Sequence, residues 1–267
     1  MPIIDSNLPG SWQDLQIYVA KILSEIGLSV TVGQTVSTAR GEIELDVMAI
    51  DETSLEKIRY IIECKNWEAN IPQSVIHSFT TVMHETGGNI GFIIARNGFQ
   101  SGAIEFVKYT NIKLYSYIEF ETRYLNVWLQ EYFLVQLDVS NDSLLQYVED
   151  IGSRRDRRVA SLGIAEREMF KILVLQYKSF GMSMCMPGSM LYGKSQMNVP
   201  VNCSVFRNKI NSKFPGIINL QSDSYRGILT ELINVIENIT FKFNCLFGRN
   251  IFYPELTDYI LAKEKDA

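Results

Sequence analysis

The sequence predicts an α/β fold, in which a central mixed sheet is flanked by helices and followed by a mostly helical C-terminal region. Three observations support this. Residues 11–26 have helical periodicity, and the next segments change to a strand pattern. Helical and apolar strand-like segments then alternate to about residue 118, and beyond residue 139 the apolar spacing is helical again. We therefore expect one domain of order αβββαβαβ over residues 1–138 and a mostly helical second domain over residues 139–267.

The individual elements follow from local signals. Ser11 is suited to cap the first helix and Gly27 to end it. Three strand-like stretches come next, LSVTVGQTV, EIELDVMAI and KIRYIIECK, and the polar DETSLEK between the last two suits a hairpin turn. After Pro72 we expect a helix at QSVIHSFTTVMHET, a buried strand at IGFIIA, a helix at GFQSGAIEFVKYT and a strand at IKLYSYI. The helical stretch FETRYLNVWLQEYFLVQL closes the domain, and DVSNDS is the expected boundary.

The formal net charge of −5 is unevenly distributed. Residues 1–150 hold 9 Lys and Arg against 20 Asp and Glu, whereas residues 151–267 hold 16 against 10. The second part, which begins with RRDRR, is suited to a polyanion such as DNA, and a solvated linker is an equally weighted alternative. The candidate nucleic-acid contacts in this part are Arg154, Arg155, Arg157 and Arg158.

Several classes of protein are disfavoured by composition. No apolar run is long enough for a membrane span and no secretory signal pattern is present, so we expect a cytoplasmic protein that makes no membrane contact. The four cysteines have no CxxC spacing, which disfavours a disulfide framework or a zinc site. The string GSMLYGKS fits the letters of a phosphate-binding loop, but no strand precedes it and Pro200 follows. Lys194 in this string remains a candidate contact for an anion such as a DNA phosphate.

Acidic side chains meet in the predicted hairpin. If its turn is centred near residue 54, antiparallel pairing places Asp46 opposite Glu63. Like charges directly opposed on neighbouring strands are destabilising, so a cation is expected between them. Because side chains alternate along a strand, Lys65 shares a face with Glu63, and Glu44 with Asp46. Such oxygen ligands suit Mg²⁺ or Mn²⁺ and would support phosphodiester hydrolysis. From spacing alone, an exposed hairpin with solvated charges is an open alternative.

The motifs also resemble a known family. In order, GEIELDV, IIECKNW and GFIIARNGFQSGAIEFVKYTNIKLYSY are similar to the PD-(D/E)xK nuclease superfamily and, within it, to the Mrr-like restriction endonuclease catalytic domain, over about residues 11–120. The resemblance implies a restriction-endonuclease-like αβββαβ core. It also implies that Asp46 is the motif acid, Glu63 the second metal-binding carboxylate and Lys65 the catalytic lysine, with the backbone carbonyl of Cys64 facing the metal.

One position departs from the family pattern. Many members carry a glutamate on the first helix where this chain has Gln16. A neutral amide can ligate a metal through its oxygen but contributes no charge, so the number of bound ions stays open. Glu44 is a further candidate metal ligand. Gln73, at the start of the helix after ECK, is a candidate contact for a phosphate.

The function that the resemblance implies is a Mg²⁺-dependent DNA endonuclease in prokaryotic restriction or anti-phage defence, with Mn²⁺ able to replace Mg²⁺. Double-stranded DNA is the expected substrate, and a homodimer or larger assembly, or a partner protein of a defence system, is expected. Two alternatives stay open. One is a catalytically weak or inactive nuclease-fold binding module within a defence complex, and the other is an RNA-cleaving nuclease.

Overall fold

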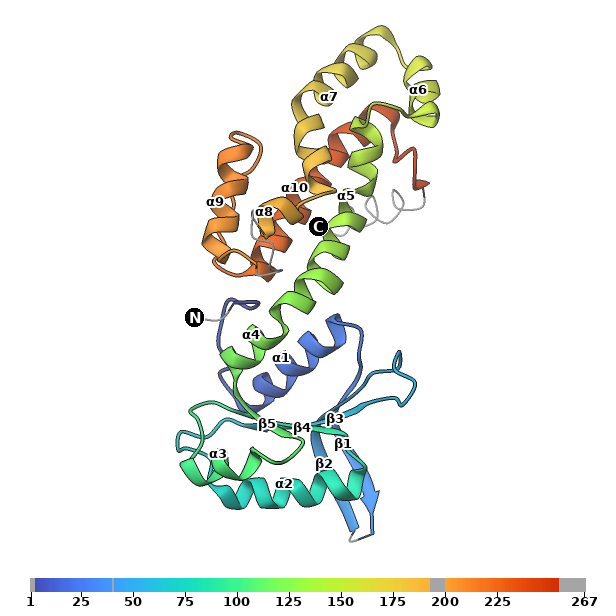
Figure 1. The fold of residues 1–267 in the computed structure, drawn as a ribbon. Helices are drawn as coiled ribbons and strands as arrows, with labels where there is room; N and C mark the ends of the chain where they lie inside the picture. Colours follow the sequence, from blue (N-terminus) through green and yellow to red (C-terminus); the bar gives the residue numbers. More distant parts are fainter. Residues whose placement is uncertain (1–2, 40, 193–199, 255–267) are drawn as a thin grey trace. The chain divides into compact units, whose positions relative to one another are not determined.

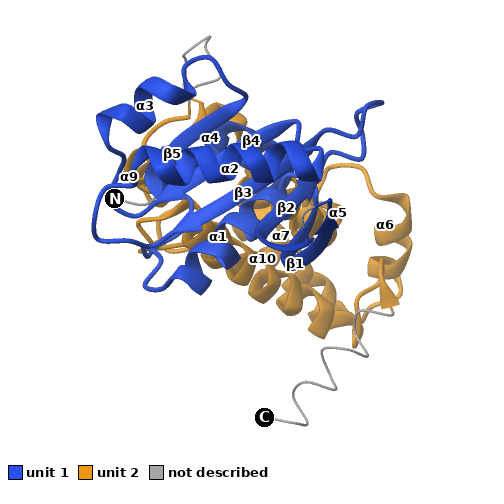
Figure 2. Ribbon diagram, turned by 90° about the horizontal axis from the view of Figure 1, so that it is seen from below, with its two compact units in different colours: residues 1–132 blue, residues 133–267 orange. Residues whose placement is uncertain are grey.

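The computed structural model describes residues 3–39, 41–192 and 200–254, and the chain divides into two compact units, residues 1–132 and 133–267 (Figures 1 and 2). The first unit contains α1 (Trp12–Glu25), β1 (Ser29–Thr38), β2 (Gly41–Ile50), β3 (Arg59–Lys65), α2 (Gln73–Thr86), β4 (Ile90–Ala95), α3 (Ser101–Val107), β5 (Ile112–Ser116) and α4 (Tyr117–Trp128). After a π-helical turn, Leu129–Phe133, the second unit contains α5 (Leu134–Val148), α6 (Ser153–Ala160), α7 (Ile164–Met184), α8 (Gly188–Leu191), α9 (Cys203–Lys213) and α10 (Tyr225–Phe247).

The first unit is built on a mixed sheet, as the sequence predicts, and its five strands lie in the order β1-β2-β3-β4-β5. Strands β1, β2 and β3 pair antiparallel, and β3, β4 and β5 pair parallel. Helices α1 and α4 cover one face of the sheet and α2 and α3 the other, so both faces are closed (Figure 1). Parallel strands joined by crossover helices are normally buried in this way, which explains the apolar sequence of β4.

Local signals in the sequence set the ends of the helices that flank the sheet. At the start of α1, the Ser11 side chain accepts a hydrogen bond from the backbone N–H of Asp14, and the Asp14 carboxylate accepts one from the backbone N–H of Ser11. This capping box satisfies two backbone donors that would otherwise lack partners. At the end of α2, Gly87 adopts the left-handed conformation with φ of 66°, which glycine tolerates best. Between the sheet and α2, the core includes Leu45, Ile61, Phe79, Met83 and Ile93.

The stretch DVSNDS, predicted as a boundary, is helical and lies within α5, and the predicted division after residue 138 likewise falls inside this helix. The division of the structure into units lies earlier, after Tyr132. Tertiary packing explains why polar residues of low helix propensity remain helical here. Leu137 and Leu144 are fully buried, and the buried Asn141 side chain donates a hydrogen bond to the carbonyl of Gly181 on α7 at 2.9 Å.

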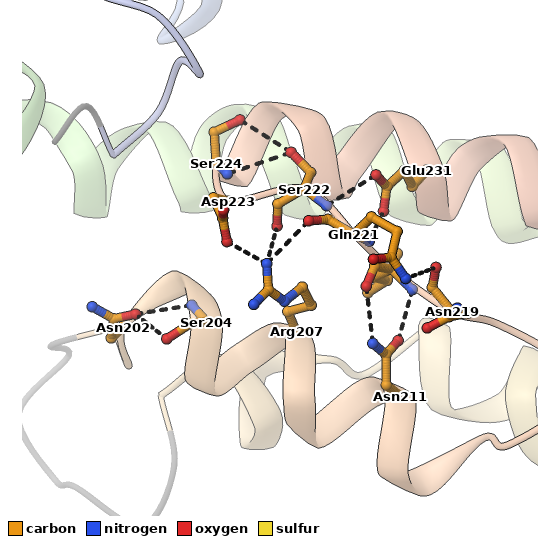
Figure 3. Close-up of polar contacts among 11 residues, drawn as sticks. Asn202, Ser204, Arg207, Asn211, Asn219, Gln221, Ser222, Asp223, Ser224 and Glu231 are labelled. Atoms are coloured by element: carbon orange, nitrogen blue, oxygen red, sulfur yellow. Dashed lines mark hydrogen bonds and ion pairs between the residues drawn. The ribbon is translucent and has the colours of Figure 1, made fainter.

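In the second unit, α5, α7 and α10 pack together, and a polar network fixes the segment between α9 and α10 (Figure 3). The Arg207 guanidinium donates to the carbonyls of Gln221 and Ser222 at 3.0 and 3.2 Å and pairs with Asp223. From the other side, the Glu231 carboxylate accepts from the backbone N–H groups of the same two residues. Arg207 is therefore engaged within the fold. Among the described residues, no helix combines the length and apolar character needed to span a bilayer.

Candidate active site

The candidate site lies where β2 and β3 part. Val47 pairs with Ile62 and Met48 with Ile61, where the β2–β3 pairing ends. Continued by one residue, the same register would put Asp46 opposite Glu63, the pair expected from the length of the hairpin turn. One residue further on, the backbone N–H of Cys64 donates to Oδ2 of Asp46 at 2.7 Å. The side chain of Asp46 thus takes the hydrogen bond that a strand carbonyl would otherwise accept.

Asp46 is also held by the first helix. The Gln16 side chain is buried, with 6% of its surface exposed, and its Nε2 donates to Oδ1 of Asp46 at 2.7 Å. Each Asp46 oxygen therefore accepts one hydrogen bond and keeps a second lone pair for another partner. Asp14, two positions before Gln16, is used in the cap of α1.

Glu63 and Lys65 form an ion pair beside Asp46, and about one fifth of each side chain is exposed. Burial raises the pKa of Glu63, and the negative charge of Asp46 raises it further, whereas the hydrogen bond from Lys65 opposes the shift. Lys65 also lies next to an aromatic ring, because its Nζ is 6.0 Å from the centroid of Trp67. The site thus holds more negative charge than its one ammonium offsets.

Cys64 lies between the two charged residues and its thiol is buried. Burial, followed by the charges of Asp46 and Glu63, raises the pKa of this thiol well above its ordinary value. A thiol that stays protonated is neither a nucleophile nor a metal ligand. The chemistry available at this position is therefore that of its backbone.

These residues border a pocket of about 230 Å³. Its lining consists of Trp12, Asp46, Cys64, Lys65, Asn66 and Trp67. Asn66 and Trp67 directly follow Lys65 in the sequence, whereas Trp12 is far from these residues along the chain. The one feature of the sequence that relates Trp12 to the site is its position directly after the cap residue Ser11, on the helix that carries Gln16.

Gln16 and Glu63 contact lining residues but are not part of the pocket lining themselves, and Glu44 and Gln73 also lie outside it. Glu44 is exposed on β2. Its Oε1 lies near Gly33 of β1, 3.8 Å from the position that a Cβ would take on that glycine. Gln73 is the first residue of α2, and its Nε2 lies 3.2 Å from Nε2 of His77. Both Gln73 and His77 are exposed.

The predicted basic residues lie in the second unit. Arg154, Arg157 and Arg158 are exposed on α6, whereas Arg155 is buried. The Arg155 guanidinium donates to three carbonyls near the end of α5, those of Gln146, Tyr147 and Glu149. Its positive charge therefore interacts with the C-terminal end of α5, where the helix dipole favours a cation. Lys194 lies outside the described residues.

The donor atoms of the pocket are suited to a hard divalent cation. In the parts of the chain that the structure describes, no cluster of three or more His, Cys, Asp and Glu side chains is positioned to hold a metal. The acidic donors here are two, Asp46 and Glu63, supplemented by the neutral oxygens of Gln16 and of the backbone. Mg²⁺ is commonly held by one or two carboxylates and keeps several waters, so this donor set fits it. The two carboxylates are offset by one ammonium, and this charge balance also favours a bound cation.

Comparison with known proteins bears on the first unit. Residues 9–123 match the model of a family described as "Restriction endonuclease" (Mrr_cat). The match confirms the predicted Mrr-like catalytic domain for these residues, and it indicates nuclease activity. A search of curated proteins finds no match. A solved structure titled "Crystal Structure of Protein of Unknown Function AF1548" is similar with 15% identity and a TM-score of 0.37, covering 85% of this chain and 98% of that one. That similarity is too weak to support an argument.

Proposed function

We propose, from the restriction endonuclease domain of residues 9–123, that this protein is a Mg²⁺-dependent endonuclease that hydrolyses phosphodiester bonds of double-stranded DNA. One observation carries the proposal. Asp46 and Lys65, from two neighbouring strands, line one pocket, and Glu63 forms an ion pair with Lys65 close enough to Asp46 to feel its charge. Mn²⁺, which has similar ligand preferences, should replace Mg²⁺.

The residues have separate tasks in this mechanism. Asp46 and Glu63 would hold the cation, with the carbonyl of Cys64 and the amide oxygen of Gln16 as neutral donors. When bound, the cation would neutralise charge on the scissile phosphate and acidify the attacking water. The hydrogen bonds from the Cys64 N–H and from Gln16 fix the Asp46 carboxylate before substrate arrives.

Lys65 would act on the reacting phosphate. With a cation held at Glu63, Lys65 would be free to donate a hydrogen bond from its ammonium to the attacking water or to a phosphoryl oxygen. The attacking water would lose a proton to solvent as its oxygen bonds to phosphorus, and the bond from phosphorus to the sugar oxygen would break, with that oxygen taking up a proton from solvent. A fixed positive charge stabilises the negative charge that develops in this transition state.

A biological setting follows from the same domain. We propose a role in restriction or anti-phage defence, as a homodimer or larger assembly or with a partner protein, and in the cytoplasm. Exposed Arg154, Arg157 and Arg158 would bind DNA phosphates. These contacts would position the protein on DNA without reading its sequence.

A second candidate is a nuclease-fold binding module with weak or no activity. The observation that favours it is the neutral Gln16, which binds Asp46 and adds no charge to the donor set. An RNA-cleaving nuclease is a third, because the chemistry of the pocket does not discriminate against ribose.

Cleavage assays separate these functions. The purified protein is incubated with supercoiled plasmid, linear duplex and RNA, in Mg²⁺, Mn²⁺ or EDTA. We expect cleavage of DNA with either metal and none in EDTA. Lys65→Ala should lower the rate by about 10² or more, the usual effect of removing one stabilising group from a transition state.

The chain offers a matched control. Glu105 and Lys108 form an exposed ion pair on α3, outside the pocket, so Lys108→Ala removes the same side chain type without touching the site. This variant should cleave like the wild type. Equal cleavage by Lys65→Ala would refute the catalytic assignment. Failure to cut any substrate with either metal would favour the binding module.

A further inference from the structure

The three tryptophans of this chain occupy two kinds of environment. Trp128 is fully buried, and its indole N–H donates to Glu25 at 2.6 Å. Trp12 and Trp67 are 51% and 45% exposed, and both line the candidate active-site pocket. Large aromatic side chains that are partly exposed at the edge of a pocket are typical of ligand contacts. Without a ligand, a buried position would be more favourable for such an apolar ring.

The two exposed rings stand on segments that are tied together. Trp12 is the first residue of α1, directly after its cap, and Trp67 lies two residues after the end of β3. Between them, the side chain of Asn66 donates to the carbonyl of Gly10 at 3.5 Å. The ammonium of Lys65, 6.0 Å from the Trp67 centroid, places this ring beside the residue proposed to act on the phosphate.

We propose that Trp12 and Trp67 form a stacking site for an unpaired nucleobase next to the scissile phosphate. This rests on the proposed nuclease function and narrows its substrate to duplex DNA that is locally unpaired at the point of cleavage, such as a bulge or a frayed end. In an intact duplex both faces of every internal base are covered by its neighbours, so these rings can reach a base only after it leaves the stack.

Size and charge support a base as the ligand. The pocket, at about 230 Å³, lies below the roughly 300–1,000 Å³ of sites for drug-sized molecules, which suits one planar ring system. Residues 1–132 hold 9 Lys and Arg against 16 Asp and Glu, so this unit is formally negative. A negative net charge weakens the attraction of DNA phosphates to this unit as a whole, whereas it does not act on a neutral base. Aromatic stacking thus provides an attraction that does not depend on charge.

Tryptophan fluorescence tests the inference without requiring cleavage. Oligothymidylate, or a hairpin duplex of perfect complementarity, is titrated into the protein in EDTA. We expect the single strand to quench the emission and the duplex to quench it much less. The double variant Trp12→Phe/Trp67→Phe keeps only the buried Trp128, and it should bind the single strand with no change in emission.

Binding measured by anisotropy of labelled oligothymidylate gives the energetic readout. Trp12→Leu and Trp67→Leu should each raise Kd by about fivefold or more, since loss of one base–aromatic stack weakens binding by roughly 5- to 150-fold. The Phe replacements should restore most of this affinity. Tyr109→Leu is the matched control, because Tyr109 is an aromatic residue of the same unit that is 96% exposed and lies outside the pocket lining. Its Kd should not change.

The outcomes distinguish the stacking site from the nuclease function. If both Leu variants bind oligothymidylate as tightly as the wild type does, or if duplex and single strand quench equally, the stacking site is refuted. Cleavage of a perfect duplex and of a bulged duplex at equal rates would refute the substrate preference while leaving the nuclease intact. Tight, Trp-dependent binding with no cleavage in any metal would refute the nuclease but keep the base site.

Discussion

Replacing Gln16 by glutamate tests whether the pocket is organised around a cation. The amide of Gln16 is buried and donates to Asp46 at 2.7 Å. In Gln16→Glu this donor becomes a carboxylate next to Asp46, the third of the site with Glu63, and two like charges about 4 Å apart interact by about 4 kcal/mol at an effective dielectric constant near 20. Uptake of a proton by one of the two carboxyls limits the cost. We therefore expect destabilisation by about 3–4 kcal/mol without metal.

Thermal unfolding measures the effect. At about 2–4 °C per kcal/mol for a chain of this size, the variant should melt about 6–16 °C below the wild type in EDTA. Mg²⁺ should reduce this difference in melting temperature. A third carboxylate strengthens cation binding, and a bound cation stabilises the folded state that binds it. The Mg²⁺ concentration at half-maximal stabilisation should be lower for the variant than for the wild type.

Gln13→Glu provides the control for charge alone. Gln13 lies on the same helix but is exposed, so the added charge meets water and the favourable N-terminal end of α1. Its melting temperature should stay within about 2 °C of the wild type in either condition, as for most surface substitutions. A Gln16→Glu protein that melts like the wild type in EDTA, with an unchanged response to Mg²⁺, would show that no cation site is centred on Asp46.

Three further predictions concern the second unit and the fold. Arg155→Gln should lower the free energy of unfolding, measured in urea, by about 2–4 kcal/mol, because it leaves carbonyls at the end of α5 without their donor. As a control, Arg157→Gln on the exposed face of α6 should change the free energy of unfolding by less than about 0.5 kcal/mol. Changing the three exposed arginines of α6 to Gln should reduce the salt slope of DNA binding by about 3, at roughly 0.9 per phosphate contact; an unchanged slope would leave α6 a purely structural helix. Burial raises the pKa of Glu121 above its usual 4.5, so the stability of the wild type relative to Glu121→Gln should be greatest below pH 4.5 and fall as the pH rises through the raised pKa. Urea unfolding at several pH values measures this difference, and a constant difference would contradict the sign.

Much of the first unit is predictable from sequence because its signals are local. The stretches QSVIHSFTTVMHET and IGFIIA coincide with α2 and β4. The β2–β3 register follows from the length of the polar turn, and it brings Asp46 and Glu63 to the end of the hairpin, each next to the last paired residues. The spacing of Glu63 and Lys65 on one strand then places the ammonium with its carboxylate partner.

Other features depend on tertiary contacts that local pattern does not encode. The sequence groups Arg155 with its neighbours, yet one turn of a short helix buries it and exposes the others. Trp12 carries no periodic signal, because its place at the pocket depends on how α1 lies against β3. α5 runs through DVSNDS because buried Leu137 and Leu144 outweigh the weak helix propensity of the polar residues.

The boundary between the units also changes the electrostatic argument. Counted from residue 133, the second unit holds 16 Lys and Arg against 14 Asp and Glu, a net charge of only +2. Arg155 and Arg207 are moreover engaged with carbonyls inside the fold. The second unit therefore has little net positive charge to offer DNA. A protein with few phosphate contacts gains little affinity from counterion release. Binding would then have to draw on contacts that salt does not screen, and the two exposed tryptophans at the pocket are suited to supply them.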